Sequence, residues 1–251
     1  MVADGLDAGQ RADDASSNGE MALLVALLLP TLTHTHAAVI PILASDGTIF
    51  LDSRAHKTIW DGCVAARAHG ASLQRFPHHD PEALERLLRQ HTRQPRLVCM
   101  DGVNSMTGNP PDLPAFAALA RAHDALLYLD DAHGFGVIGQ RTADEPCPYG
   151  RRGNGVVRHL GETYDHLVLT GGFSKAYSSL LAFVAGPTAL KRLLKVAAPP
   201  TCTPGRRRSP RWPARWSASR STTPAATSSA RCSTPGPGGS STISTSWGRP
   251  P

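Results

Sequence analysis

The stretch YLDDAHGFGVIG, residues 128–139, places two carboxylates and a histidine between an apolar run and three glycines. Asp130, Asp131 and His133 are hard or borderline ligands, so a metal site is one interpretation. A cofactor site and a purely structural polar turn are the other two. Because side chains alternate along a strand, Asp130 and Asp131 point to opposite faces and only one can act with His133. The chain has no partner pattern such as HExxH, which disfavours a metal and predicts none.

A lone lysine lies in LTGGFSKAYSS, residues 169–179, among small residues that let a planar ligand come close. Lysine forms Schiff bases with carbonyl compounds, although most lysines are simply solvated surface charges. Asp130 and Lys175 together match the needs of pyridoxal 5'-phosphate. This cofactor binds a lysine as a Schiff base and uses a carboxylate to keep its ring nitrogen protonated. The two residues therefore predict a pyridoxal-phosphate site.

Alternating apolar and helical patterns between residues 21 and 200 indicate the elements that position these side chains. A helix is predicted at 80–91, with Asp80 as N-cap and Pro81 in its first turn, and a second helix at 112–125. Buried strands are predicted at 48–52, 96–100, 126–130 and 166–170, and a buried strand or helix at 21–29.

Apolar strands separated by helices are typical of an α/β fold, with a mostly parallel sheet sandwiched by helices. Ligands of such sheets bind beyond the carboxyl ends of the strands. Asp101, Asp130 and Thr170 lie at three of these ends. The fold pattern and the chemical pattern therefore point to one edge of the sheet.

The run DGVNSMTGNPPDLPAFAALARAHDALLYLDDAHGFGVIG, residues 101–139, resembles the α-oxoamine synthases. These are pyridoxal-phosphate enzymes of fold type I, in the class I and II aminotransferase superfamily. Their runs read EGVFSMDGD, PLPEI and VDDAHGTGVLG. RAHKTIWDGC, which begins at Arg54, is similar to their NHASIIDGC. FSKAYSSLLAFVAGP, which begins at Phe173, is similar to LSKAFGSxGGFVAG. The resemblance covers about residues 30–200.

The resemblance implies a role for each matching residue. Lys175 would be the Schiff-base lysine, and Asp130 would pair with the pyridine nitrogen. His133, helped by Ser105, would hydrogen-bond the ring hydroxyl, and His56 would stack on the ring face.

The phosphate would lie at PTLTHTHAAVI, residues 30–40, which stands in the place of the family's SGYxANxxxI. Thr31 and Thr33 are the phosphate candidates there. We expect this segment to be extended, with His34 and His36 on one side as pocket lining.

The chain departs from the family pattern at four places near the site. Leu32 replaces the glycine of SGYxAN, and Asn104 replaces the phenylalanine before Ser105. Gly172 stands where the family has a serine or threonine that contacts the phosphate. Thr170 or Ser174 would substitute for that hydroxyl. The family's Gly-Gly after the lysine is Leu181-Ala182.

The activity implied by the resemblance is condensation of an amino acid with an acyl-CoA, with loss of CO2, at a homodimer interface. An aminotransferase or another fold type I reaction is one alternative. An inactive remnant is another, because the family's further N-terminal segment and its C-terminal small domain are not recognisable. We therefore predict a disordered leader at 1–20, a partial large domain at 21–200 and an unstructured tail at 201–251, rich in Arg, Ser and Pro.

Composition bounds the partners and the compartment. Removing the tail's eight arginines from the formal net charge of +6 leaves about −2 for residues 1–200, so the net positive charge comes from the tail alone. The charge of residues 1–200 therefore does not predict that they bind nucleic acid. Five cysteines without a CxxC pair indicate free thiols in a reducing compartment. The apolar run at 21–29 is too short to span a bilayer. We expect a cytoplasmic protein that does not bind membranes.

Overall fold

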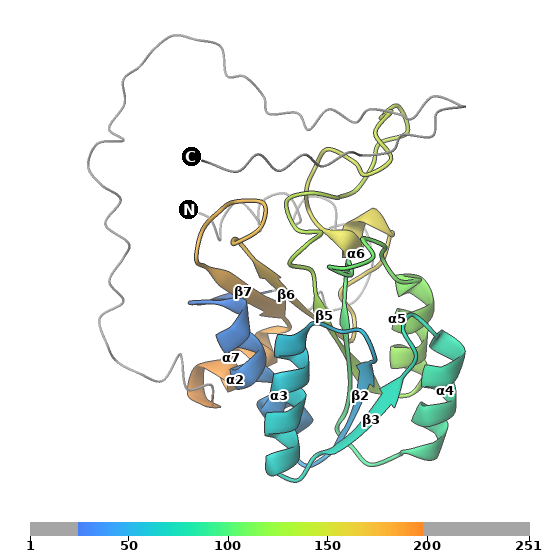
Figure 1. Cartoon of the computed structure of the whole chain (residues 1–251), viewed down its shortest axis with the longest axis vertical. Coiled ribbons are helices and arrows are strands. Elements are labelled where there is room, and N and C mark those ends of the chain that lie inside the picture. Colours follow the sequence, from blue (N-terminus) through green and yellow to red (C-terminus); the bar gives the residue numbers. More distant parts are fainter. Residues whose placement is uncertain (1–24, 198–251) are drawn as a thin grey trace, which may run out of the picture. The chain divides into compact units, whose positions relative to one another are not determined.

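The computed structural model describes residues 25–197 (Figure 1). The predicted leader at 1–20 and tail at 201–251 lie outside the described residues, so the domain boundaries stay predictions. Among the described residues, no helix is long and apolar enough to cross a membrane.

A seven-stranded sheet forms the centre, in the order β1-β7-β6-β5-β4-β2-β3. The five strands from β6 to β3 run parallel, whereas β7 is antiparallel to both β1 and β6. The predicted mostly parallel sheet is therefore confirmed. The strands are β1 (Val25–Leu29), β2 (Thr48–Asp52), β3 (Ser72–Phe76), β4 (Arg96–Asp101), β5 (Ala125–Asp130), β6 (Leu167–Gly172) and β7 (Ala182–Gly186).

Between residues 25 and 197, six helices connect or flank these strands. Helix α4 begins as expected with Asp80 as its cap, which accepts from the N–H of Ala83. The second predicted helix, α5, also begins with an aspartate cap, because Asp112 accepts from the N–H of Ala115. The helices are α2 (Leu32–Ala44), α3 (Lys57–Ala68), α4 (Pro81–Gln90), α5 (Leu113–Ala122), α6 (Val156–His159) and α7 (Thr188–Ala197).

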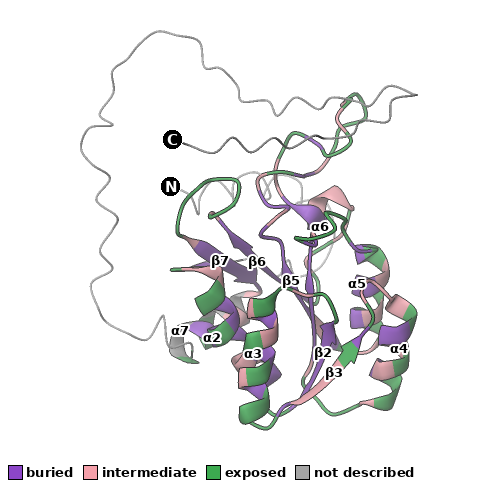
Figure 2. Ribbon diagram, in the orientation of Figure 1, coloured by how far each residue is buried: buried purple, intermediate pink, exposed green. Residues whose placement is uncertain are grey.

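The helices cover both faces of the sheet, and each face has its own apolar core (Figures 1 and 2). On one face, α2 and α3 bury residues such as Ile40 and Ile59. On the other, α4 and α5 bury residues such as Leu84 and Phe116. Alternation along β5 sends Tyr128 to the first core and Leu127 and Leu129 to the second. This sandwich holds the carboxyl ends of β4, β5 and β6 at one edge.

The expectation of an extended chain at residues 30–40 is wrong, because α2 begins at Leu32. Thr31 caps the helix by accepting a hydrogen bond from the N–H of His34 at 3.2 Å. Val39 and Ile40 follow His36 at the three- and four-residue spacing of a buried helical face. His34 and His36 therefore do not share a side: His34 is exposed, and His36 is fully buried.

Candidate functional site

A cavity of about 480 Å³ lies at the carboxyl ends of β4 and β5 and at the N-terminus of α2. Its volume is in the range of sites that bind small molecules and cofactors. The fold brings together residues that are far apart in sequence, because parallel strands end at the same edge. Eight of the predicted site residues line it: Thr31, Thr33, His56, Ser105, Asp130, His133, Ser174 and Lys175.

Among the residues predicted to bind the cofactor, Thr170 does not line the cavity. It is fully buried in β6, and its hydroxyl donates to the carbonyl oxygen of Leu129 at 3.2 Å. Of the two hydroxyls offered as substitutes at Gly172, Ser174 is therefore the one that reaches the cavity.

Asp130 ends β5 with its carboxylate held from two sides. Oδ1 accepts a hydrogen bond from the N–H of Ala132 at 3.0 Å, and Oδ2 lies 3.1 Å from Nε2 of His36. The side chain is almost fully buried yet lines the cavity. A carboxylate in this setting presents a fixed negative charge to a ligand.

His36 was predicted to line the pocket, but it does not. It lies behind Asp130, with Nδ1 2.9 Å from the hydroxyl of Tyr128. Its contact with the site runs through Asp130, which sequence reasoning missed. The only sequence signal is its place on the same helical face as Val39 and Ile40, where an apolar residue is expected.

His133 follows β5 and is half-buried. Burial lowers the pKa of His133 from its usual value, and the positive charge of Lys175 lowers it further. Asp130 opposes these effects, and His56 adds a smaller lowering. His133 is thus electrostatically coupled to the three other catalytic candidates, which supports their convergence in one site.

Asp101, at the end of β4, is a cavity residue that was noted at a strand end but not predicted as part of the site. Its Oδ1 accepts from the backbone N–H of His56 at 3.2 Å, and its Oδ2 accepts from Nδ2 of Asn104 at 3.3 Å. Burial, followed by the nearby charge of Asp130, raises the pKa of Asp101 to about 7. Asp101 therefore ties the loop that carries His56 to the sheet edge.

Asn104 explains one departure from the family pattern. Its Oδ1 accepts from the backbone N–H groups of Met106 and Thr107, at 3.0 and 3.1 Å. Its Nδ2 also donates to the carbonyl oxygen of Arg54 at 3.1 Å. The amide thus closes the turn that carries Ser105 and joins it to the turn that follows β2.

Asp131 points away from the cavity, as alternation predicts. Its Oδ2 accepts from the N–H of Val156 at 2.9 Å, which joins β5 to the start of α6. A Cβ added at Gly134 or Gly155 would lie only 2.1 or 2.3 Å from its carboxylate oxygens. Burial raises the pKa of Asp131 to about 7. The Asp131 carboxylate therefore fills the space that Gly134 and Gly155 leave open, and its role is structural.

The N-terminus of α2 supplies the cavity's candidate anion site. Free backbone N–H groups and the helix dipole favour an anion at such an end. Thr31 and Thr33 line the cavity there. Leu32 lies beside them, and a Cβ added at Gly172 would lie only 2.5 Å from its Cδ1. Two departures from the family pattern are therefore in contact.

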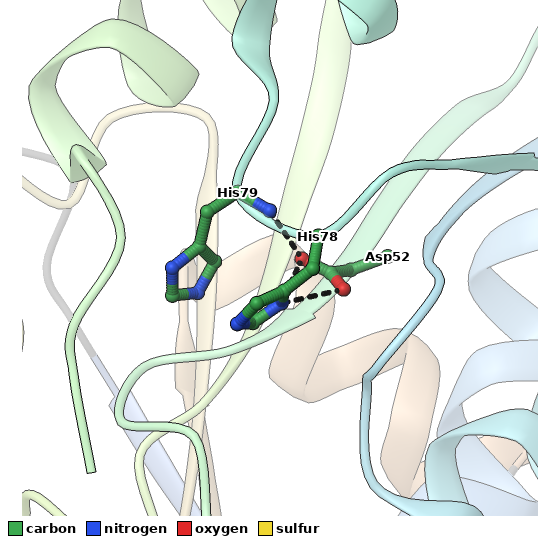
Figure 3. Close-up of side chains that lie close together, drawn as sticks. All are labelled: Asp52, His78 and His79. Carbon is green, nitrogen blue, oxygen red and sulfur yellow. Dashed lines mark hydrogen bonds and ion pairs between the residues drawn. The ribbon is translucent and has the colours of Figure 1, made fainter. Parts of the chain in front are cut away.

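Asp52, His78 and His79 form the one group of metal-binding residue types gathered within the described part of the chain (Figure 3). Asp52 is already hydrogen-bonded, by Nδ1 of His78 at 2.9 Å and by the backbone N–H groups of Arg54 and His79. The two imidazoles are stacked, with centroids 3.6 Å apart and planes at 29°. Nitrogen lone pairs lie in the ring planes, so those of stacked rings run side by side and do not converge on an ion. This group is best interpreted as a hydrogen-bonded turn before α4.

Residues 34–210 match the family model described as aminotransferase class I and II. A putative 8-amino-7-oxononanoate synthase from Desulforudis audaxviator is 41% identical over 170 residues, which are 67% of this chain and 41% of that protein. An 8-amino-7-oxononanoate synthase from Cupriavidus necator is 38% identical over 164 residues, 64% of this chain and 37% of that protein.

Among solved structures, a serine palmitoyltransferase from S. paucimobilis with a bound PLP–myriocin aldimine has a similar fold. The TM-score is 0.61 at 26% identity, over 78% of this chain and 44% of that one. This similarity confirms the predicted fold class, a mostly parallel sheet with helices. The chain spans less than half the length of each of these three relatives.

Proposed function

The chain belongs to the aminotransferase class I and II family, and from this premise we propose that it is a pyridoxal-phosphate enzyme of the α-oxoamine synthase type. The proposed reaction condenses an amino acid with an acyl-CoA and releases CO2. The names of the two curated relatives support this reaction within the family. The observation that carries the proposal is that Lys175, Asp130 and the N-terminus of α2 border one cavity.

These groups fit pyridoxal 5'-phosphate, because an amine, a carboxylate and an anion site match its aldehyde, ring nitrogen and phosphate. When bound, the cofactor supplies an electron sink that stabilises negative charge on the substrate's α-carbon. Lys175, which is exposed to the cavity, is the amine that would hold the aldehyde. Asp130 would accept a hydrogen bond from the protonated ring nitrogen, and its fixed carboxylate would stabilise the positive charge there.

The remaining lining residues orient the ring and the phosphate. His133 and Ser105 would hydrogen-bond the ring hydroxyl. His56 would lie against the ring face, and its own ring is fixed because Nδ1 accepts from the N–H of Thr58. Thr31, Thr33 and Ser174, with the first N–H groups of α2, would bind the phosphate.

We also propose that the active form is a homodimer in the cytoplasm. Two large apolar side chains at or beside the cavity are exposed. Leu180 lines the cavity and is 82% exposed, and Met106, which follows the lining residue Ser105, is 90% exposed. Exposed apolar side chains of this size around a site favour cover by another protein surface. The free cysteines of the described residues favour a reducing compartment.

Transamination is a second candidate, because the matched family model includes aminotransferases by name. It uses the same cofactor and the same lysine. The products separate the two reactions: condensation releases free CoA and CO2, whereas transamination yields a 2-oxo acid without consuming acyl-CoA.

The experiment that tests the cofactor site is a titration of the purified chain with pyridoxal phosphate, followed by its visible absorbance. A band that saturates in the wild type and is absent in Lys175→Ala is expected. Lys57→Ala is the matched control, since Lys57 lies at the start of α3 with its amine paired to Asp61. A band that survives in Lys175→Ala, or no band in the wild type, would contradict the proposal.

A further inference from the structure

We propose that His36 is a positioning residue that holds the Asp130 carboxylate, through its Nε2–H, in the orientation that pairs with the ring nitrogen of the bound cofactor. This inference rests on the proposed function and deepens it, because it assigns the site a residue that does not touch the ligand. His36 is fully buried and does not line the cavity, so it acts only through Asp130.

The hydrogen-bond partners assign the protons along this chain of groups. An ionised carboxylate only accepts, so at 3.1 Å from Asp130 Oδ2 the Nε2 of His36 is the donor. Nδ1 of the same ring then accepts from the hydroxyl of Tyr128 at 2.9 Å. Burial, followed by the charge of Asp130, raises the pKa of Tyr128 well above its usual value, so the phenol keeps the proton that it donates. Tyr128 therefore donates a hydrogen bond to His36, and His36 donates one to Asp130.

This arrangement removes the rotational freedom of the carboxylate. Oδ1 is held by the N–H of Ala132 at 3.0 Å and Oδ2 by His36, so the plane of the carboxylate is fixed before any ligand arrives. Hydrogen bonds to an ionised acceptor in a buried setting are stronger than neutral ones. The fixed plane leaves the remaining lone pairs for the cavity side.

Helix α2 carries both the residues of the candidate anion site and His36. Its first turn bears Thr31 and Thr33 at the cavity, and its next turn bears His36 beneath Asp130. Because both contacts belong to one rigid helix, the anion site and the carboxylate are held at a constant separation. A ligand that carries a phosphate and a cationic ring nitrogen is the kind that such a spacing selects.

Three variants test the assignment. His36→Leu removes both ring nitrogens at a similar size. His36→Gln keeps a donor, because the longer amide side chain can reach the place of Nε2. Tyr128→Phe removes only the hydroxyl, and Tyr149→Phe at an exposed tyrosine is its control. Folding of each is checked by circular dichroism and urea unfolding.

The first measurement uses the protein without cofactor. The ¹⁵N shifts of the His36 ring are expected to show the proton on Nε2, and Asp130→Asn is expected to change them. The second measurement is the dissociation constant for pyridoxal phosphate by absorbance titration. His36→Leu should weaken binding by roughly tenfold or more, and His36→Gln by about threefold or less. Tyr128→Phe should fall between them.

Three results overturn the inference while leaving the proposed function intact. The first is a wild type that binds through Lys175 and a folded His36→Leu of equal affinity. The second is an equal loss of affinity in His36→Leu and His36→Gln, which would indicate a packing role. The third is a proton on Nδ1 of His36 in the cofactor-free protein. Failure of the wild type to form the Lys175-dependent band overturns both proposals.

Discussion

Leu32 occupies the space that a side chain at residue 172 would need. Its Cδ1 lies 2.5 Å from the place of a Cβ on Gly172, and its Cγ lies at 3.1 Å. Leu32 is the first residue of α2, and Gly172 is the last of β6. The resembling family has a glycine at the first position and a hydroxyl residue at the second. The two departures therefore compensate each other sterically, because Leu32 fills the space that Gly172 leaves open.

We expect Gly172→Ser to lower the free energy of unfolding by about 1 kcal/mol, the low end of the usual cost of overpacking, because the terminal methyl group of the half-buried Leu32 must move aside. In a Leu32→Ala background the same change should cost clearly less, because the space is then open. Urea unfolding of the wild type, both single variants and the double variant gives the coupling. Costs that simply add would show that the two residues do not compete for space.

Asp131→Ala should lower the free energy of unfolding by about 1–3 kcal/mol, because it leaves the buried N–H of Val156 without its acceptor. Hydrogen exchange at the Val156 amide should accelerate as the join between β5 and α6 loosens. Asp112→Ala, which removes the exposed cap of α5, is the control and should leave that amide unchanged. Unchanged exchange at Val156 in Asp131→Ala would contradict the role given to this carboxylate.

The parts of the site that could be predicted from the sequence depend on signals between residues close together in the chain. Period-two alternation separated Asp130 from Asp131, and the pair Asp80–Pro81 marked the start of α4. These signals act over a few residues and depend on backbone geometry that any neighbouring structure preserves. They were enough to place the strand ends, and so one edge of the cavity.

The parts that it missed depend on contacts across the fold. His36 meets Tyr128 and Asp130 at separations of 92 and 94 residues, and nothing in PTLTHTHAAVI indicates those partners. The alternating threonines and histidines favoured an extended chain, but the cap at Thr31 and the apolar face beyond it produced a helix. Strands β3 and β7 were not predicted either. β3 is a polar edge strand, and β7 is recognised mainly by its place between β1 and β6.

The homodimer proposed here predicts that the wild type sediments as a dimer at about micromolar concentration. The double variant Met106→Glu, Leu180→Glu should sediment as a monomer, because charges replace the exposed apolar side chains beside the cavity. Val64→Glu is the control: Val64 is also an exposed apolar residue, but it lies on α3, outside the cavity lining. A wild-type monomer, or a double variant that still forms dimers, would rule out this surface as the interface.

Asp101→Asn should change how stability depends on pH. An aspartate in the unfolded chain titrates near about pH 4, whereas the folded pKa of Asp101 is about 7. Between these values the folded protein holds a proton that the unfolded chain has released. The contribution of Asp101 to stability is therefore complete below about pH 4, falls as the pH rises towards 7, and stays constant above it. Asparagine does not titrate, so the variant lacks this loss.

Urea unfolding of both proteins at about pH 5 and about pH 8 measures the effect. The free energy of unfolding of Asp101→Asn minus that of the wild type should rise by about 1–3 kcal/mol from the lower to the higher pH. Its amide also faces Nδ2 of Asn104, but any cost of that contact is the same at both pH values and cancels in the difference. Asp165→Asn, at an exposed aspartate, is the control and should show the wild-type pH dependence. Parallel pH profiles for Asp101→Asn and the wild type would mean that Asp101 is already ionised in the folded protein at pH 5. The buried carboxylate at the end of β4 would then add a second negative charge to the cavity beside Asp130.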